Sequence, residues 1–351
     1  MQKVRWGVIG AGGIADRRTI PGLLMSENAQ LVAVMDICGK TVEAVAKKYS
    51  VENYYDIEDK LLEHQNIDAV YIASPVSAHY KQAVKAAKAG KHILMEKPLA
   101  LDTKQGKELI VVCKNQNVLF AAGFMMRFHP YHIKAKELVS SGALGDIVSM
   151  RAQLTCWYPD MQGAWRQNFA ESGGGALMDM GIHCIDLLQY ISGAKVRSVS
   201  ALLGTKTFNY DTEDSASVLM EFSNGAYGYV DSNFNIPDDA AECRLEIYGT
   251  KGSILAAGTI SQAEGGTFNL TLSDNSDYDA EQNRKVGGNA SADVEFGNMY
   301  AKEITSFGRS VLEGIPLEVP SEDALNVQHI IECAYRSAKE RRFIEVEELN
   351  D

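Results

Sequence analysis

The stretch GGGALMDMGIHCID, residues 173–186, sets an aspartate four positions before a histidine, directly after three glycines. Side chains four apart share one face of a helix, so Asp179 and His183 are expected side by side. A histidine ionises near neutral pH and can take up a proton and return it, while the carboxylate orients the ring or a reacting hydroxyl. A plain ion pair on a helix surface is the alternative. The three glycines favour a site, because a backbone without Cβ atoms can approach a ligand closely.

A lysine occupies a second position suited to chemistry. The run KHILMEKP, residues 91–98, indicates a buried strand that leads into Glu96 and Lys97. In doubly wound sheets ligands bind beyond the carboxyl ends of the strands, which is where Lys97 would project. Pro98 cannot continue the strand and restricts Lys97 to extended backbone angles. A lysine after a strand is also common on open surfaces, so the position alone leaves both roles open.

Near the start of the chain, Gly10, Gly12 and Ala15 fit the pattern G-x-G-x-x-G/A between an apolar run and a helical stretch. The first residue permits a tight turn, the second lets the backbone approach a pyrophosphate, and the small third residue lets helix and strand pack closely. Asp36 ends the next apolar run about 20 residues on, where an acid would bind both ribose hydroxyls. Its charge would repel a 2′-phosphate, which favours NAD over NADP. The alternative is that Asp36 only caps the helix that follows.

These residues need a parallel sheet to position them. Apolar runs at 4–9, 31–36, 68–74 and 91–95 alternate with amphipathic helical patterns. Such alternation is typical of strands joined by right-handed helical crossovers. The first third of the chain therefore predicts an α/β, doubly wound sheet of the Rossmann type.

The composition limits the classes of function. The chain has 351 residues, which is comfortable for two domains, and a net charge of −12, which disfavours binding to nucleic acid. Its six cysteines show no paired spacing, which argues against a disulfide framework and suits a reducing compartment. The sequence shows neither a signal peptide nor an apolar run of membrane-spanning length, so we expect a cytoplasmic protein with no membrane contact.

Three motifs in register, GVIGAGGIA, MEKPLA and SGGGALMDMGIHCIDLL, resemble those of the Gfo/Idh/MocA family over essentially the whole chain. The resemblance implies a Rossmann domain, here residues 1–122, and a catalytic and oligomerisation domain, residues 123–351, with a large, mostly antiparallel sheet. It implies a homodimer or homotetramer formed through that sheet, a cis peptide bond before Pro98, hydride transfer, and a catalytic set matching Lys97, Asp179 and His183. One departure is Val76, where the family often has asparagine.

The resemblance gives each member of this set a role. During oxidation of a secondary alcohol, His183 would take the hydroxyl proton and return it in the reverse direction. Asp179 would orient the imidazole or the substrate, and Lys97 would stabilise the developing alkoxide or relay the proton. The nicotinamide cofactor performs the redox step, and the protein supplies position and electric field.

Further contacts complete the expected site. The residues expected to bind the cofactor are Gly10, Gly12, Gly13, Ile14, Asp36, Ser74, Pro75, His79, Glu96, Lys97 and Arg127. Those expected near the substrate are Arg127, Tyr158, Trp165, Arg166, Asp179 and His183. A capping or surface role for Arg127, and core packing of the tryptophans, stay open. A zinc site at His129, His132, His183 and Cys184 lacks compact ligand spacing, so no metal is expected.

The leading hypothesis is an NAD-dependent oxidoreductase acting on a secondary alcohol or ketone of a sugar, polyol or related cyclic substrate. The alternatives are an NAD-assisted glycosidase of the same superfamily and a non-catalytic sugar or dinucleotide sensor. The polar segment 257–293 is expected to form loops and irregular hairpins, with its later part, 277–293, mobile.

Overall fold

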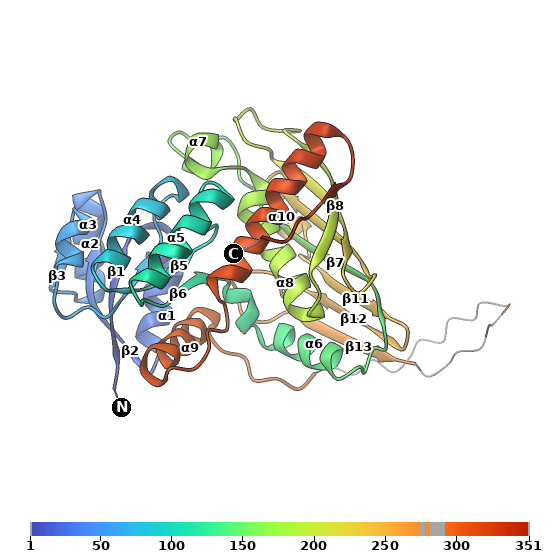
Figure 1. Cartoon of the computed structure of the whole chain (residues 1–351), viewed down its shortest axis with the longest axis horizontal. Helices are drawn as coiled ribbons and strands as arrows, with labels where there is room; N and C mark the ends of the chain where they lie inside the picture. Colours follow the sequence, from blue (N-terminus) through green and yellow to red (C-terminus); the bar gives the residue numbers. More distant parts are fainter. Residues whose placement is uncertain (1, 274–277, 279, 281–291, 350–351) are drawn as a thin grey trace. The chain divides into compact units, whose positions relative to one another are not determined.

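The computed structural model describes residues 2–273, 278, 280 and 292–349. The chain divides into two compact units, each assembled from three segments. Unit 1 consists of Met1–Met125, Gly163–Gly173 and Gly297–His329, and unit 2 consists of Met126–Gln162, Gly174–Phe296 and Ile330–Asp351. Figure 1 traces the chain through both.

Unit 1 is built on a six-stranded sheet in the order β3-β2-β1-β4-β5-β6, in which all neighbouring strands run parallel. The strands are β1 (Val4–Ile9), β2 (Ala29–Met35), β3 (Asn53–Tyr55), β4 (Ala69–Ile72), β5 (His92–Glu96) and β6 (Phe120–Gly123). The helices between them are α1 (Ile20–Met25), α2 (Gly39–Tyr49), α3 (Glu58–Leu62), α4 (Val76–Lys88) and α5 (Thr103–Asn115).

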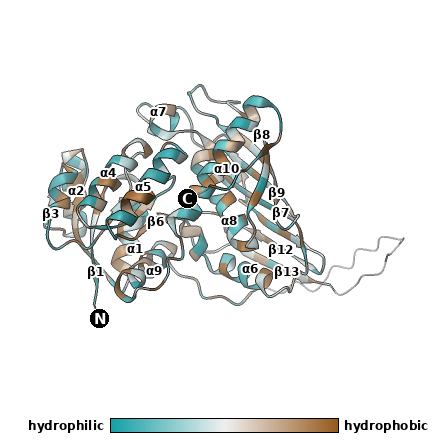
Figure 2. Cartoon of the chain, viewed as in Figure 1, coloured by the Kyte–Doolittle hydropathy of each residue, from teal (hydrophilic) through white to brown (hydrophobic). Residues whose placement is uncertain are grey.

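This sheet confirms the predicted doubly wound architecture. Every residue of β4 is buried, as expected for a parallel strand covered on both faces. The covering helices α2, α4 and α5 carry both polar and apolar residues, seen as teal and brown in Figure 2. The strand order reverses between β1 and β4, so the carboxyl ends of these two strands mark the expected ligand-binding edge.

A segment far along the chain completes unit 1. Helix α9 (Met299–Glu313) lies beside α1 in Figure 1 and packs against it. The ring centroids of Phe307 and Trp6 are 5.4 Å apart, and both residues belong to the core around β1. The predicted division between residues 122 and 123 lies close to the first boundary of the compact units, at Met125 and Met126, but unit 1 also includes 163–173 and 297–329.

Unit 2 is built on an eight-stranded sheet in the order β13-β12-β11-β7-β10-β9-β8-β14, antiparallel except for the pair β7 and β10. The strands are β7 (Ile147–Thr155), β8 (Val196–Gly204), β9 (Ser215–Phe222), β10 (Tyr227–Asn233), β11 (Leu245–Gly249), β12 (Gly252–Ala257), β13 (Thr267–Leu272) and β14 (Ile344–Glu345). This arrangement confirms the mostly antiparallel second sheet.

Helices cover one face of this sheet. Helix α8 (Ile182–Ser192) packs on β7 and β10 and against α6 (Pro130–Ser140). Helix α10 (Ser321–Glu340) passes from unit 1 into unit 2, where the N–H of Ala201 on β8 donates to the hydroxyl of Ser337. Figure 1 shows α8 and α10 in front of the strands of unit 2. These helices bury the inward side of strands that alternate between buried and exposed residues.

Two widened, π-type turns interrupt the helices that follow the glycine motifs. The first spans Ala15–Thr19 and has an identifiable cause, because Pro21 lacks the N–H that a regular helix would use and its ring crowds the preceding turn. The second spans Leu177–Gly181 and contains Asp179. Turns of this kind are rare and often occur at functional sites, and the sequence analysis predicted regular helix at both places.

The polar segment 257–293 is described in part. Strands β12 and β13 form an antiparallel hairpin, which agrees with the expected hairpins. The stretch 277–293, expected to be mobile, lies almost wholly outside the described residues. Among the helices that the structure describes, none combines the length and apolar character needed to cross a membrane.

Candidate functional site

The fingerprint of unit 1 forms the tight turn that the sequence predicted. Gly10 has a φ of +79°, and a Cβ there would lie 2.6 Å from the main-chain nitrogen of Ser74. The turn therefore requires glycine. The N–H groups of Gly10 and Ala11 each donate to the carbonyl of Met35 at 2.9 Å, which ties the turn to the end of β2. Ala15 is fully buried, as the small third residue of a fingerprint should be.

Asp36 lies against this turn. Its Oδ2 accepts from the N–H of Gly12 at 3.1 Å, and its Oδ1 accepts from the N–H of Cys38 at 3.0 Å. Helix α2 begins at Gly39 with Cys38 as its N-cap and without a side-chain cap, so Asp36 does not cap the helix. Each carboxylate oxygen keeps a second lone pair, and the group is half-buried. The turn and the acid together fit the pyrophosphate and adenosine ribose of a dinucleotide.

Lys97 follows β5, and its peptide bond to Pro98 is cis, as the family resemblance implies. His79 of α4 is 1% exposed, and its ring nitrogens lie 2.9 Å from the carbonyl oxygens of Pro98 and Ser74. Burial lowers the pKa of His79 to about 4, with a contribution from the charge of Lys97. A neutral ring has a single N–H, so it donates to one of these two carbonyls at a time, between the segments that follow β4 and β5. A direct contact between His79 and the cofactor stays a prediction.

The remaining predicted cofactor contacts lie in the segments that follow β1 and β4. Gly13 has a φ of +57° with open space where a Cβ would project, and Ile14 follows it at the start of the helix. Pro75 is the N-cap of α4, and the Ser74 hydroxyl donates to Gln82 of that helix. All of them follow β1 or β4, and their contact with a cofactor stays a prediction.

A buried acid that was not predicted, Glu303, lies in unit 1 and interacts electrostatically with Glu96. The hydroxyl of Tyr71 donates to Oε1 of Glu96 at 2.6 Å. Glu303 of α9 is 2% exposed, and neither of its carboxyl oxygens has a hydrogen-bond partner among the described residues. Burial raises the pKa of Glu303 well above its usual range, and the charge of Glu96 adds to this shift. An uncharged Glu303 is therefore favoured. The sequence pattern that could have indicated this burial is the position of Glu303 in α9, three residues after Tyr300 and four before Phe307, on the apolar face of the helix.

In unit 2 the segment after the triple glycine carries Asp179 and His183. Asp179 lies in the widened turn, half-buried, and its N–H donates to the carbonyl of Gly175 at 2.9 Å. His183 lies in the first turn of α8 and is 6% exposed. A histidine so shielded from water can exchange a proton with a bound hydroxyl without competition from bulk solvent. The proton-transfer role of the pair stays a prediction.

Arg127 is buried, at 5% exposure, in an ion pair with Asp186 of α8. Its Nε lies 3.0 Å from Oδ2, and its Nη2 lies 2.5 Å from Oδ1. The guanidinium also lies over the ring of Tyr190, 5.1 Å from the centroid. This two-point contact between the Arg127 guanidinium and the Asp186 carboxylate joins α8 to the start of unit 2. These contacts give Arg127 a structural role, and its predicted contact with cofactor or substrate is still untested.

The aromatic residues predicted to contact the substrate are divided between the units. Tyr158 belongs to unit 2, where its ring packs on Phe234 with the centroids 5.1 Å apart. Trp165 and Arg166 belong to unit 1, in a short helical turn, and the Arg166 guanidinium lies 4.3 Å from the centroid of the Trp165 ring. Their contact with a substrate stays a prediction.

The histidines considered as metal ligands are engaged with the protein. His132 is fully buried, with Nδ1 at 2.8 Å from the carbonyl of Met126 and Nε2 at 3.1 Å from the Thr259 hydroxyl. Burial lowers the pKa of His132 to about 3, so the ring is neutral. His129 has Nε2 at 3.0 Å from the carbonyl of Gly265. In the described part of the chain no group of three or more histidine, cysteine or acidic side chains could hold a metal ion.

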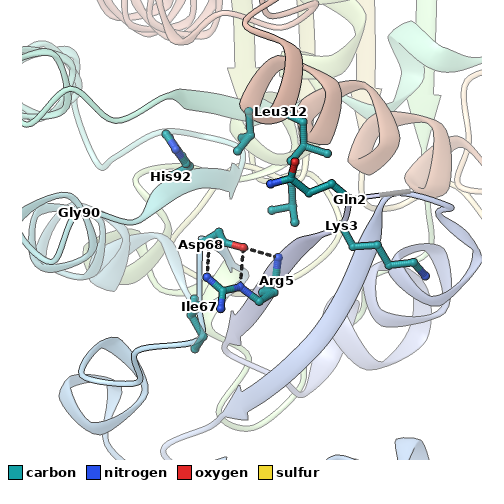
Figure 3. A pocket seen from close by; sticks show the side chains of 10 residues that line it. Gln2, Lys3, Arg5, Ile67, Asp68, Gly90, His92 and Leu312 are labelled. Atoms are coloured by element: carbon teal, nitrogen blue, oxygen red, sulfur yellow. Dashed lines mark hydrogen bonds and ion pairs between the residues drawn. The ribbon is translucent and has the colours of Figure 1, made fainter.

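A pocket of about 500 Å³ lies in unit 1 at the amino ends of β1, β4 and β5 (Figure 3). Its charged groups are largely paired, since Nη2 of Arg5 lies 2.6 Å from Oδ1 of Asp68 and Nε lies 2.9 Å from Oδ2. His92, also in its wall, accepts a hydrogen bond from the N–H of Leu119 at 3.0 Å. Parallel sheets bind ligands at the other edge, where Asp36 and Lys97 lie. This pocket is therefore not the candidate site.

Comparisons with known proteins agree with this geometry. Residues 4–124 match the model of an oxidoreductase family with an NAD-binding Rossmann fold, and residues 132–255 match the GFO/IDH/MocA C-terminal domain. The scyllo-inositol 2-dehydrogenase (NAD(+)) of Bacillus subtilis is 31% identical over 76% of this chain and 80% of its own. The D-xylose 1-dehydrogenase (NADP(+)) 2 of Haloferax volcanii is 27% identical over 97% of this chain and 99% of its own.

A solved structure extends the likeness to three dimensions. The aldose-aldose oxidoreductase from Caulobacter crescentus, complexed with glycerol, matches with a TM-score of 0.88 and 25% identity. The match covers 98% of this chain and 100% of that one. With its fingerprint, its cis Lys97–Pro98 bond and its two family domains, this chain belongs to the Gfo/Idh/MocA family of oxidoreductases.

Proposed function

We propose that this oxidoreductase uses NAD to transfer a hydride to or from a secondary alcohol or ketone of a sugar, polyol or related cyclic substrate. The observation that carries the proposal is the set Lys97, Asp179 and His183, found with a dinucleotide fingerprint in a chain similar to inositol and xylose dehydrogenases. We further propose a cytoplasmic location, because the spacing of the six cysteines is not that of a disulfide framework and suits a reducing compartment.

Different residues of this chain would bind the cofactor, transfer the proton and stabilise the charge on the substrate. The fingerprint turn and Asp36 hold the dinucleotide, which supplies the hydride acceptor when it is bound. His183 accepts the proton of the substrate hydroxyl during oxidation and returns it during reduction. Asp179 orients the imidazole or the hydroxyl, and the ammonium of Lys97 stabilises the negative charge that develops on the substrate oxygen.

A substrate panel tests this function. The purified protein is mixed with NAD and a series of free inositols, pentoses, hexoses and their glycosides, and reduced nicotinamide is followed by its absorbance. We expect reduced cofactor to accumulate with at least one free polyol or sugar. Release of a sugar from a glycoside without net cofactor reduction would indicate the glycosidase instead. Binding of NAD without turnover of any compound would indicate a sensor.

Cofactor preference is predicted from Asp36. Its carboxylate should accept hydrogen bonds from the ribose hydroxyls and repel a 2′-phosphate, so kcat/KM should favour NAD over NADP by at least tenfold, or about 1.4 kcal/mol. Replacing the acid in Asp36→Ser should narrow this ratio. Steady-state kinetics with both cofactors measure it. Equal use of NAD and NADP by the unmutated protein contradicts the assignment.

The sheet of unit 2 supports the proposed homo-oligomer. Its strands place large apolar side chains on the exposed face, among them Leu202 on β8, Leu219 on β9, Tyr227 and Tyr229 on β10 and Leu255 on β12. Tyr229 and Leu219 are directly paired across neighbouring strands, so exposed apolar groups gather on β8, β9 and β10, whereas Glu246 and Arg151 separate Leu255 from them. Sedimentation should give a dimer or a tetramer. A monomer at micromolar concentration would exclude this use of the face.

A further inference from the structure

Two adjacent acidic residues between β8 and β9 are buried in unit 2. Glu213 is 8% exposed and Asp214 is fully buried. Buried carboxylates are costly unless hydrogen bonds satisfy them, so their partners show what they hold in place. Neither residue has a role predicted from the sequence.

Glu213 holds the beginning of the segment that carries Asp179 and His183. Its Oε2 accepts from the N–H of Gly175 and its Oε1 accepts from the N–H of Leu177, both at 2.9 Å. Its main-chain carbonyl accepts from the N–H of Ala176 at 3.0 Å. One residue from a distant loop thus satisfies three consecutive donors that a helix start leaves open. The negative charge also suits the positive end of the helix dipole.

This contact explains two of the three glycines. A Cβ on Gly175 would collide with the carbonyl of Glu213, and a Cβ on Gly174 would collide with the hydroxyl of Tyr335. The Tyr335 hydroxyl in turn donates to Oε1 of Glu213 at 2.8 Å. The glycines therefore make room for groups of the protein itself, where the sequence analysis expected them to make room for the cofactor.

Asp214 holds a different segment. Its Oδ1 accepts from the N–H of Lys206 at 2.8 Å, and its Oδ2 accepts from the N–H groups of Thr207 and Phe208 at 2.8 and 3.0 Å. Burial by itself would raise the pKa of Asp214, but these N–H donors outweigh it and lower the pKa. The carboxylate therefore stays charged and fixes the loop between β8 and β9.

That loop packs on Tyr158, which is expected near the substrate, and on its neighbour Trp157. The ring of Phe208 meets Trp157 edge-on with the centroids 5.1 Å apart, and the hydroxyl of Tyr210 donates to the carbonyl of Tyr158 at 3.3 Å. Trp157 keeps 44% of its surface exposed, so its face is open to a ligand. Aromatic faces of this kind suit the apolar side of a sugar ring.

We propose that Glu213 and Asp214 form a positioning pair, in which Glu213 sets the proton-transfer helix and Asp214 sets the aromatic substrate-binding segment. This inference rests on the proposed function. Because the two carboxylates hold different parts, they should act on different kinetic constants. Misplacing His183 slows the chemical step, whereas misplacing Trp157 and Tyr158 weakens substrate binding.

The test compares Glu213→Gln with Asp214→Asn, two substitutions that conserve size and remove one acceptor. We expect Glu213→Gln to lower kcat about tenfold with KM changed less than threefold. We expect Asp214→Asn to raise KM about tenfold with kcat changed less than threefold. Glu137→Gln, at an exposed acid on α6 of the same unit, is the matched control and should change neither constant. Folded variants whose constants stay unchanged, or in which both constants move together, overturn the proposal.

Milder variants keep the test valid if an amide substitution unfolds the protein. Tyr335→Phe removes one donor to Glu213 and should reduce kcat in the same direction, and Tyr210→Phe removes the contact to Tyr158 and should raise KM. Hydrogen exchange at the amides of residues 175–177 separates this inference from the proposed function. Faster exchange in Glu213→Gln is expected even if no substrate is found. Unchanged exchange would overturn the proposal that Glu213 holds residues 175–177 in place.

Discussion

The Lys97→Ala variant should fold and bind NAD almost normally but turn over about a hundredfold or more slowly. The physical reason is that the ammonium stabilises charge that develops on the substrate oxygen only during the reaction, so its loss affects kcat more than binding. Turnover is measured at saturating NAD with the best compound of the substrate panel. Thermal unfolding and NAD titration are measured on the same preparation.

Two further lysine variants separate charge from structure. Lys97→Arg keeps a positive charge but changes its shape and reach, so it should recover only part of the activity. Lys104→Ala, at an exposed position on α5, should behave like the unmutated protein. If Lys97→Ala lost thermal stability and kept its specific activity, Lys97 would be a structural residue.

The fold of unit 1 could be predicted from the sequence because each of its strands and crossover helices has its own pattern over a few neighbouring residues. Buried parallel strands are short apolar runs, and each crossover helix has its own amphipathic pattern. The fingerprint could be read in the same way, since the turn at Gly10 depends on a backbone angle that glycine adopts freely. The return of α9 to unit 1 depends instead on Phe307 packing against Trp6, a contact between distant residues that no local pattern contains.

The parts of the site that the sequence analysis missed are also contacts between distant residues. No role was predicted for Asp186, yet it forms the buried ion pair with Arg127. No role was predicted for Glu213 and Asp214 either, although they hold two separate segments. An acid beside a strand is usually solvated, so its type alone does not reveal that it is buried. The widened turn at Asp179 was hidden for a related reason, because helix propensity does not report how a turn packs.

The His183→Asn variant should lose most of the oxidation activity and also the acidic limb of its pH profile. If His183 is the general base, oxidation needs the neutral imidazole, so kcat/KM of the unmutated protein falls as the pH drops through the pKa of this histidine. Asparagine can keep a hydrogen bond but cannot take up the proton. The measurement is kcat/KM against pH in the direction of alcohol oxidation, for both proteins.

Two comparisons complete this prediction. Asp179→Asn should reduce turnover less, because this residue orients the imidazole or substrate and need not carry the proton. His64→Asn, at a histidine before β4 whose Nδ1 accepts from the N–H of Asn66, should leave the pH profile unchanged. Near-normal turnover of His183→Asn with an unchanged pH profile would refute the role of His183. Lys97 would then be the better candidate for the base, and Asp179 and His183 would serve to position the substrate.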